Sequence, residues 1–230
     1  MDPRQRLIVA LDVSTATAAR KIVAAVGDSA LAYKVGMQLY TAEGPSIVRE
    51  LVVSGHRVFL DLKYHDIPNT VAAAVREAAQ LGVSMLTVHA SGGGKMLRAA
   101  VEAAKARPEL LVLGVTVLTS FDDIELGKIG LRGGVLDQVL RLAALALSNG
   151  CKGVVASAQE AAALREEFGR DFVIVTPGVR LAGSGPHDQA RVVTPAEAIS
   201  AGASHIVVGR PITEASDPTA EARAILGQMG

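Results

Sequence analysis

Short apolar runs alternate with longer amphipathic stretches along almost the whole chain. The runs are too short for buried helices, and several are continuously apolar, which is typical of parallel strands covered on both faces. They predict eight strands, at residues 7–12, 32–37, 57–63, 85–90, 111–118, 153–157, 172–178 and 205–210.

The stretches between these runs are rich in alanine and carry apolar residues at helical spacing. Gly82 after Leu81, and Pro195 after Thr194, are typical stop and start signals of helices. The pattern predicts helices at residues 15–26, 44–54, 69–81, 94–106, 135–149, 158–168, 195–201 and 215–229.

Eight strand–helix units follow one another without a Pro- or Ser-rich linker, so we expect a single domain over residues 1–230. The leading prediction is the α/β class and a (β/α)8 TIM barrel, a fold that often has about 200–250 residues. An open doubly wound sheet is the alternative, because periodicity alone does not separate the two.

Composition supports an α/β core and removes one class of function. Hydrophobic residues make up 50% of the chain and aromatic residues only 3%, so Ala, Val, Leu and Ile must fill the core. The 23 Lys and Arg residues balance the 23 Asp and Glu residues. A neutral chain with few aromatic rings lacks the basic surface and stacking platforms of nucleic-acid binders, so we expect no nucleic-acid partner.

The first apolar run is too short for a signal-peptide core or a membrane span. The single cysteine, Cys151, cannot form an internal disulfide, which is the usual situation in a reducing compartment. We therefore expect a cytoplasmic protein that does not contact a membrane.

Charged residues gather at the carboxyl ends of the predicted strands, where a barrel of this kind places its chemistry. Asp12 ends the first strand and Lys34 lies in the second. Asp61 and Lys63 end the third, and Arg210 ends the eighth. Charges on otherwise apolar strands are costly to bury unless they are paired.

The third strand predicts how they meet. Side chains alternate along a strand, so Asp61 and Lys63 should face the barrel mouth together, with Leu62 turned outward. Lys34 from the neighbouring strand and Asp66 from the following loop would complete an array of alternating charge. Such an array is either catalytic or a structural salt-bridge network, and the spacing alone does not decide.

Two loops suit a phosphate group, because TIM barrels often bind phosphate with the loops after strands seven and eight. Gly209 and Arg210 end the eighth predicted strand, and a guanidinium matches phosphate oxygens well. The Gly-rich loop at residues 177–186 follows the seventh strand and is expected to close as a lid. Arg180 and Gln189 flank that loop.

The segment from Asp61 to Thr70 resembles the Asp-x-Lys-x-x-Asp-Ile-Pro-Asn-Thr signature of the orotidine 5′-phosphate decarboxylase family. Related barrels share the short Asp-x-Lys-x-x-Asp string, whereas the full ordered set of motifs is specific. The further matches are Ala10-Leu11-Asp12, Lys34-Val35-Gly36, Val88-His89-Ala90, Thr116-Val117-Leu118-Thr119-Ser120, Thr176-Pro177-Gly178-Val179-Arg180, Asp188-Gln189-Ala190-Arg191 and Val207-Val208-Gly209-Arg210.

The resemblance implies decarboxylation of orotidine 5′-monophosphate to uridine 5′-monophosphate without metal or organic cofactor. By the motif match, Lys63 stabilises the negative charge at C6 of the pyrimidine and then supplies the proton. Asp61 would lie near the departing carboxylate, and Lys34 and Asp66 would complete the electrostatic array.

The resemblance also implies the substrate contacts. Asp12 and Lys34 would bind ribose hydroxyls, and Thr119 would hydrogen-bond the pyrimidine. Arg180 and Gln189 match the family's phosphate ligands, together with the Gly209-Arg210 pair at the other phosphate loop.

A homodimer is the quaternary structure that the resemblance implies. In similar enzymes the positions of Asp66, Ile67 and Thr70 reach into the active site of the neighbouring subunit. The active unit would then contain two shared sites.

Two other functions stay open from the residues. Magnesium-dependent sugar-phosphate decarboxylases or aldolases of related barrels use a similar Asp-x-Lys-x-x-Asp string, but they usually lack a lysine at the place of Lys34 and the Ile-Pro-Asn-Thr continuation. A non-catalytic barrel that binds a pyrimidine nucleotide would need the phosphate and ribose residues but not Lys63 beside Asp61. None of the five histidines pairs with another at metal-ligand spacing, so no metal site is expected.

Overall fold

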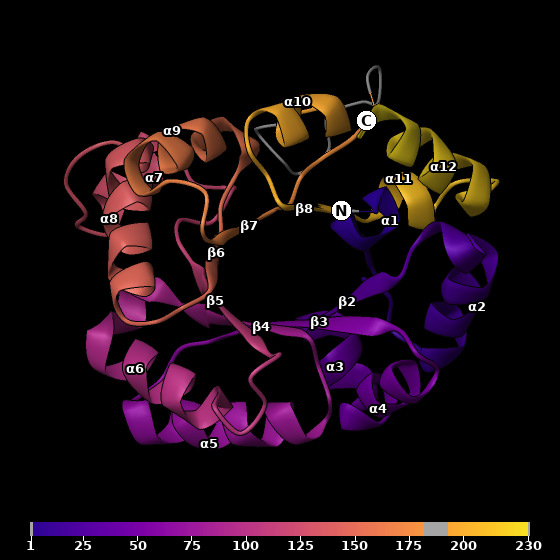
Figure 1. Ribbon diagram of the computed structural model, residues 1–230, viewed down its shortest axis with the longest axis horizontal. Coiled ribbons are helices and arrows are strands. Elements are labelled where there is room, and N and C mark those ends of the chain that lie inside the picture. The colour runs from indigo at the N-terminus through magenta and orange to yellow at the C-terminus, as the bar shows by residue number, and fades with distance from the viewer. Residues whose placement is uncertain (1, 182–192, 230) are drawn as a thin grey trace.

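The computed structural model describes residues 2–181 and 193–229. In these stretches eight parallel strands pair in chain order, and the first pairs with the last, so the sheet closes into a barrel (Figure 1). The predicted TIM barrel is confirmed, and the open doubly wound sheet is wrong. The strands are β1 (Leu7–Ala10), β2 (Ala32–Gly36), β3 (Arg57–Tyr64), β4 (Met85–His89), β5 (Leu111–Val115), β6 (Gly153–Val155), β7 (Val173–Thr176) and β8 (His205–Val208).

The helices form an outer ring around the strands (Figure 1). All eight predicted helices are present, with ends that differ by a few residues from the predicted ones. They are α2 (Ala16–Val26), α4 (Pro45–Val53), α5 (Pro68–Gln80), α6 (Gly93–Ala104), α8 (Val135–Ser148), α9 (Ala158–Phe168), α10 (Pro195–Ser200) and α12 (Pro218–Gln228).

Four short helices were not predicted from the sequence, because a helix of one or two turns shows too little periodicity to be recognised. They are α1 (Pro3–Arg6), α3 (Met37–Glu43), α7 (Asp123–Lys128) and α11 (Arg210–Thr213). Two 3-10 turns, η1 (Gly27–Ser29) and η2 (Ala90–Gly92), were also not predicted.

Several predicted strands run too far at their carboxyl ends. The fifth was predicted to continue to Leu118 and the seventh to Gly178, and both residues instead line a cavity beyond the strand. Asp12 lies two residues beyond β1, and Arg210 begins α11 rather than ending β8. Apolar residues that line a cavity look like a continued strand in the sequence, which explains the error.

Two apolar layers hold the barrel together. An inner cluster fills the barrel, and an outer one packs the strands against the helix ring. Small residues let the layers approach closely: a Cβ added at Gly153 would lie 2.2 Å from the Val173 carbonyl oxygen, and one at Gly114 would lie 2.6 Å from the Ala146 side chain. The high alanine and glycine content is therefore a packing requirement. The inner cluster consists of Ile8, Ala10, Ala32, Phe59, Met85, Leu113, Val175 and Val207.

The amino end of the barrel carries basic side chains. Arg6, at the end of α1, donates hydrogen bonds to the carbonyl oxygens of Ala203 and Ser204 and so ties the start of the chain to the segment before β8. Arg57 begins β3 and His205 begins β8. His205 shares the inward face with Val207, two residues further along its strand.

Among the described residues, no helix has both the length and the apolar character needed to cross a membrane.

Candidate active site

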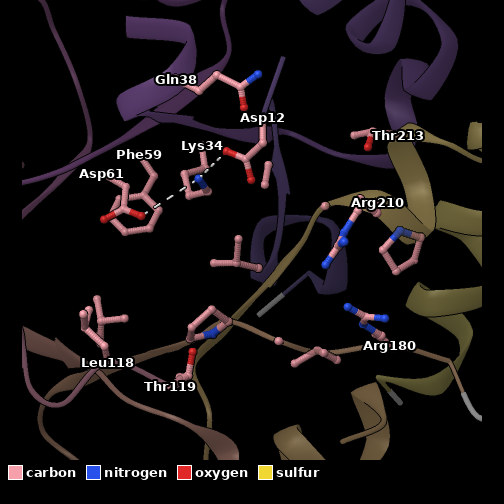
Figure 2. A pocket seen from close by; sticks show the side chains of 18 of the residues that line it. Asp12, Lys34, Gln38, Phe59, Asp61, Leu118, Thr119, Arg180, Arg210 and Thr213 are labelled. Carbon is pink, nitrogen blue, oxygen red and sulfur yellow. Dashed lines mark hydrogen bonds and ion pairs between the residues drawn. The ribbon is translucent and has the colours of Figure 1, made fainter. Parts of the chain in front are cut away.

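A cavity of about 560 Å³ opens at the carboxyl ends of the strands, the end where barrels of this kind place their chemistry. Its size is within the usual range for small-molecule sites, roughly 300–1,000 Å³. Figure 2 shows acidic and basic side chains of β2, β3 and the loop after β1 on one side, and two guanidinium groups on another. The predicted residues that line the cavity are Asp12, Lys34, Asp61, Lys63, Thr119, Arg180, Gly209 and Arg210.

Four charged side chains form a chain of ion pairs on one wall. Lys34 Nζ lies 2.8 Å from Asp12 Oδ1 and 3.9 Å from Asp61 Oδ2. Lys63 Nζ lies 2.8 Å from the same Asp61 oxygen. Asp61 therefore lies between two ammonium groups, and Figure 2 shows the line from Asp12 through Lys34 to Asp61. The predicted meeting of Lys34, Asp61 and Lys63 is confirmed, and Asp12 is joined to it.

Lys63 reaches Asp61 by a route that simple alternation does not describe. Its φ is +50°, in the left-handed region, and it is the one non-glycine residue with a positive φ in residues 2–181 and 193–229. The pairing of β3 with β4 shifts between Leu60 and Tyr64. Leu62 packs against the outer cluster, as predicted. A left-handed lysine is strained by roughly 1–3 kcal/mol and persists only where its surroundings hold it.

Thr87 of β4 holds Lys63 in this conformation through a hydrogen bond. Its side-chain oxygen accepts a hydrogen bond from the Lys63 backbone N–H at 2.9 Å and donates one to Asp61 Oδ1 at 3.0 Å. The residue is fully buried. The sequence analysis did not identify Thr87, because a threonine inside an apolar strand has no motif, and only the three-dimensional pairing of β3 with β4 brings it to the site.

Gly36 is a second residue that the sequence analysis did not assign a role. A Cβ at this position would lie 2.7 Å from Lys34 Nζ and 3.2 Å from Asp12 Oδ1. Glycine thus leaves room for the Lys34–Asp12 pair. Its position two residues after Lys34, at the end of the same strand, is the signal that could have identified it.

The opposite side of the cavity is basic. Arg180 follows β7, is only 5% exposed, and lies beside Arg210 in Figure 2. Both line the cavity, as does Gly209. A Cβ at Gly209 would make only ordinary contacts, the nearest at 3.5 Å from Ala10 Cβ, so the protein itself leaves space at that backbone. The predicted phosphate residue Gln189 lies outside the described residues.

Asp66, Ile67 and Thr70 do not line this cavity. All three are exposed, and Asp66 Oδ1 accepts a hydrogen bond from the Ile67 backbone N–H at 2.6 Å. Within one chain, therefore, Asp66 does not join the array of Lys34, Asp61 and Lys63. A second hollow of about 340 Å³ lies here instead, and Lys63, Asp66 and Thr70 line it.

Burial shifts the pKa values of two further groups, His89 and Cys151. His89 stacks on His65 with ring centroids 5.3 Å apart, and burial, then the neighbouring His65, lowers the pKa of His89. Burial raises the pKa of Cys151 to about 12, which agrees with an unreactive core thiol. In the part of the chain that the structure describes, no group of three His, Cys, Asp or Glu side chains could hold a metal ion.

Comparison with known proteins finds similar chains over nearly the whole sequence. A family model described as "Orotidine 5'-phosphate decarboxylase / HUMPS family" matches residues 5–225. The chain is 48% identical over 231 residues to the orotidine 5'-phosphate decarboxylase of Hydrogenovibrio crunogenus, with 100% of this chain and 98% of that protein covered. It is 53% identical over 225 residues to the protein of the same name from Halorhodospira halophila, with 97% and 95% covered.

A solved structure gives the same result at the level of the fold. The crystal structure of orotidine 5'-phosphate decarboxylase from Lactobacillus acidophilus superposes with a TM-score of 0.87 and is 39% identical in sequence. The alignment covers 98% of this chain and 99% of that one.

Proposed function

The chain belongs to the orotidine 5′-phosphate decarboxylase / HUMPS family, and we propose that it converts orotidine 5′-monophosphate into uridine 5′-monophosphate and carbon dioxide. The observation that carries this function is the cavity in which Asp61 lies between the ammonium groups of Lys34 and Lys63, facing two arginines across the open space. That arrangement suits a substrate with a carboxylate at one end and a phosphate at the other.

The reaction needs stabilised charge and one proton. The bond between C6 and the carboxylate breaks, carbon dioxide leaves, and the electron pair stays on C6. Lys63 Nζ provides a fixed positive charge beside C6 and transfers one proton to it, after which water reprotonates the amine. Fixed charges aimed at a developing anion are usually the largest catalytic contribution in such a site.

Asp61 has two roles in this proposal. It orients Lys63 through the 2.8 Å ion pair, and its negative charge opposes the substrate carboxylate until carbon dioxide has left. Lys34 shares the same oxygen at 3.9 Å and moderates that negative charge.

The rest of the substrate has its own contacts. Asp12 and Lys34 bind the ribose hydroxyls, and Thr119 hydrogen-bonds the pyrimidine. The position of all three on the cavity wall supports these assignments.

The phosphate binds at the opposite side, to the guanidinium groups of Arg180 and Arg210 and to the backbone at Gly209. Arg180 is nearly buried, and a charged hydrogen bond is strong in such a place. Gln189 completes the phosphate contacts in this proposal.

The active unit is a homodimer in which Asp66, Ile67 and Thr70 complete the partner's site. Their exposure, and the 67% exposure of the Ile67 side chain in particular, support this assignment. So does the hollow that Lys63, Asp66 and Thr70 share beside the main cavity. The single buried cysteine suits work in the cytoplasm.

Turnover in chelator tests the function. Purified protein is mixed with orotidine 5′-monophosphate and a chelator, and the loss of pyrimidine absorbance is followed. We expect rapid conversion by the wild type, and a fall on the order of a thousandfold or more for Lys63→Ala. Lys21→Ala, at an exposed lysine of α2, is the control and should match the wild type.

The magnesium-dependent reaction of related barrels is the second candidate, because those barrels use a similar Asp-x-Lys-x-x-Asp string, which this chain has at residues 61–66. One observation argues against it: both oxygens of Asp61 are already engaged, by Thr87 and by Lys63, and two ammonium groups would repel a divalent cation. Turnover that disappears in chelator and returns with magnesium would replace the proposal. Binding of uridine 5′-monophosphate without any turnover would indicate a nucleotide-binding barrel.

Subunit mixing tests the shared site. Lys63→Ala and Asp66→Ala proteins are each expected to be nearly inactive. In a mixed dimer, one site would combine the intact Lys63 of one chain with the intact Asp66 of the other, so mixing should restore activity toward a quarter of the wild-type level, roughly, if chains exchange freely. Absence of any recovery between exchanging chains would show that Asp66 acts within its own subunit.

A further inference from the structure

We propose that Thr87 is a positioning residue for the decarboxylation: its hydroxyl fixes both the backbone of Lys63 and the carboxylate of Asp61. The inference rests on the proposed decarboxylase activity and adds a residue to its machinery. Thr87 does not line the cavity, so it acts through these two neighbours rather than on the substrate.

Thr87 is placed for this role by its strand. It lies on β4, two residues after Met85, whose side chain belongs to the inner cluster, so Thr87 faces the barrel interior as well. Leu86 and Val88, on either side of it, pack into the outer cluster. Among these apolar neighbours a buried hydroxyl is costly unless it is hydrogen-bonded, and here it is bonded twice.

The hydroxyl accepts one of the two hydrogen bonds and donates the other. The Lys63 N–H donates to Oγ1 at 2.9 Å, so the oxygen serves as an acceptor toward β3. The hydroxyl proton is then directed to Asp61 Oδ1, 3.0 Å away. Serine could make both bonds, whereas valine, of nearly the same shape, could make neither.

The bond to Lys63 holds an unfavourable backbone. The regular pairing of β3 with β4 is interrupted between Leu60 and Tyr64, and Lys63 has φ +50°. Its N–H is satisfied by the Thr87 side chain rather than left unpaired in the interior. Without the hydroxyl, both the strain and an unpaired N–H would favour another conformation of Lys63, in which Nζ points elsewhere.

The bond to Asp61 fixes the plane of the carboxylate. Oδ1 is held by Thr87 and Oδ2 by Lys63 Nζ, so rotation of the carboxylate about its bond to Cβ is restricted. If the first bond is lost, Asp61 can turn toward Lys34, whose Nζ is 3.9 Å from Oδ2. The Asp61 carboxylate, which faces the substrate carboxylate, would then move together with Lys63 Nζ, the proton donor.

A set of substitutions tests the proposal. Thr87→Val removes the hydroxyl and keeps the shape, Thr87→Ser keeps the hydroxyl, and Thr87→Ala removes it without crowding. Thr176→Val is the matched control, because Thr176 is also fully buried on a barrel strand and its hydroxyl has no partner among the described residues.

The expected result is a fall in kcat with little change in KM. For Thr87→Val and Thr87→Ala we expect kcat to fall on the order of 10²-fold, the usual effect of losing one preorganised group, and KM to stay within about threefold. Thr87→Ser should recover kcat to within about tenfold of the wild type. Thr176→Val should leave both constants near the wild-type values.

Other outcomes would overturn the role of Thr87. It fails if Thr87→Val behaves like Thr176→Val, or if Thr87→Ser is as slow as Thr87→Ala. Should Thr87→Val not fold, the comparison of Thr87→Ser with Thr87→Ala decides in the same way. An inactive wild type would instead overturn the decarboxylase assignment, so the two failures are distinguishable.

Discussion

The two ends of the barrel both carry basic side chains, but the surroundings of these side chains differ. At the carboxyl end, Lys34 and Lys63 each lie against a carboxylate, and Asp61 lies between them. At the amino end, the imidazole of His205 is almost completely buried, and neither ring nitrogen has a hydrogen-bond partner among the described residues.

The difference indicates that the basic groups at the amino end bear on stability and those at the carboxyl end on chemistry. Burial, followed by the charges of Arg57 and Arg6, lowers the pKa of His205 to about 4. The amino end is therefore built to keep a base neutral, whereas the carboxyl end brings cations and anions into contact around an open cavity. A charge change at the amino end should alter the free energy of unfolding, and a charge change at the carboxyl end should alter turnover.

Removing the shared anion should have the largest effect. Asp61→Asn keeps the shape of the side chain but leaves Lys34 and Lys63 without their common carboxylate. We expect kcat/KM for orotidine 5′-monophosphate to fall on the order of 10²–10³-fold. The measurement is steady-state turnover, with Asp171→Asn at an exposed position as the control. A loss of less than tenfold would mean that the array is mainly structural.

Lowering the pH should act on the opposite end. The folded protein holds the pKa of His205 at about 4, below its ordinary value of 6.5. Above pH 6.5, therefore, protonation of this residue does not affect the free energy of unfolding. As the pH falls from 6.5 toward 4, His205 becomes protonated in the unfolded chain but stays neutral in the folded protein. The free energy of unfolding should then decrease by an amount on the order of 3 kcal/mol.

Urea unfolding of the wild type and of His205→Leu at pH 7 and pH 4.5 measures this contribution. Other groups also titrate in that range, so the informative quantity is the difference in pH dependence between the two proteins. Equal pH dependence in both would show that His205 is not the group responsible.

Crowding the Lys34–Asp12 pair should have a smaller effect. The new methyl group of Gly36→Ala would lie 2.7 Å from Lys34 Nζ, and the flexible end of the lysine can move away. We expect the unfolding free energy to change by less than about 1 kcal/mol and KM to rise about tenfold, since the proposed ribose contacts of Asp12 and Lys34 would be disturbed. Gly227→Ala, which meets open space, is the control. An unchanged KM would separate this ion pair from substrate binding.

Removing one cation from the amino end should have the smallest effect. Arg57→Met removes the arginine whose charge lowers the pKa of His205 more than that of Arg6, so that pKa should rise, while burial still keeps it below the ordinary value. Titration of the imidazole ring protons by NMR measures the change, with Arg49→Met at an exposed position as the control. An unchanged or lower pKa would mean that burial alone keeps His205 neutral.

The sequence predicted what depends on local pattern. Strand and helix periodicity predicted the barrel, and charges on neighbouring strands predicted that Lys34, Asp61 and Lys63 meet, together with Asp66, in whose place the structure has Asp12. Spacing along a strand could not reveal the left-handed backbone of Lys63, because that conformation depends on a hydrogen bond to another strand.

Residues defined by long-range contacts were the ones that the sequence did not identify. Thr87 matters only because β4 lies beside β3, and Gly36 only because two charged side chains meet above it. Asp66 shows the reverse situation: its motif is clear, yet within one chain it stays outside the cavity. A motif identifies a residue without showing which side chains it meets in the fold.

The pairing of β1 with β8 has a consequence for how the protein is made. Leu7 pairs with Ile206 and Val9 with Val208, so strands from the two ends of the chain close the sheet. At a synthesis rate of roughly 5–20 residues per second, β1 waits roughly 10–40 seconds for its neighbour to leave the ribosome. All four residues of β1 are buried in the finished barrel, and during that interval one edge of this apolar strand is open to other chains. The nascent chain therefore keeps an unpaired apolar strand edge until β8 is made, and slower translation of the residues before β8 lengthens that interval.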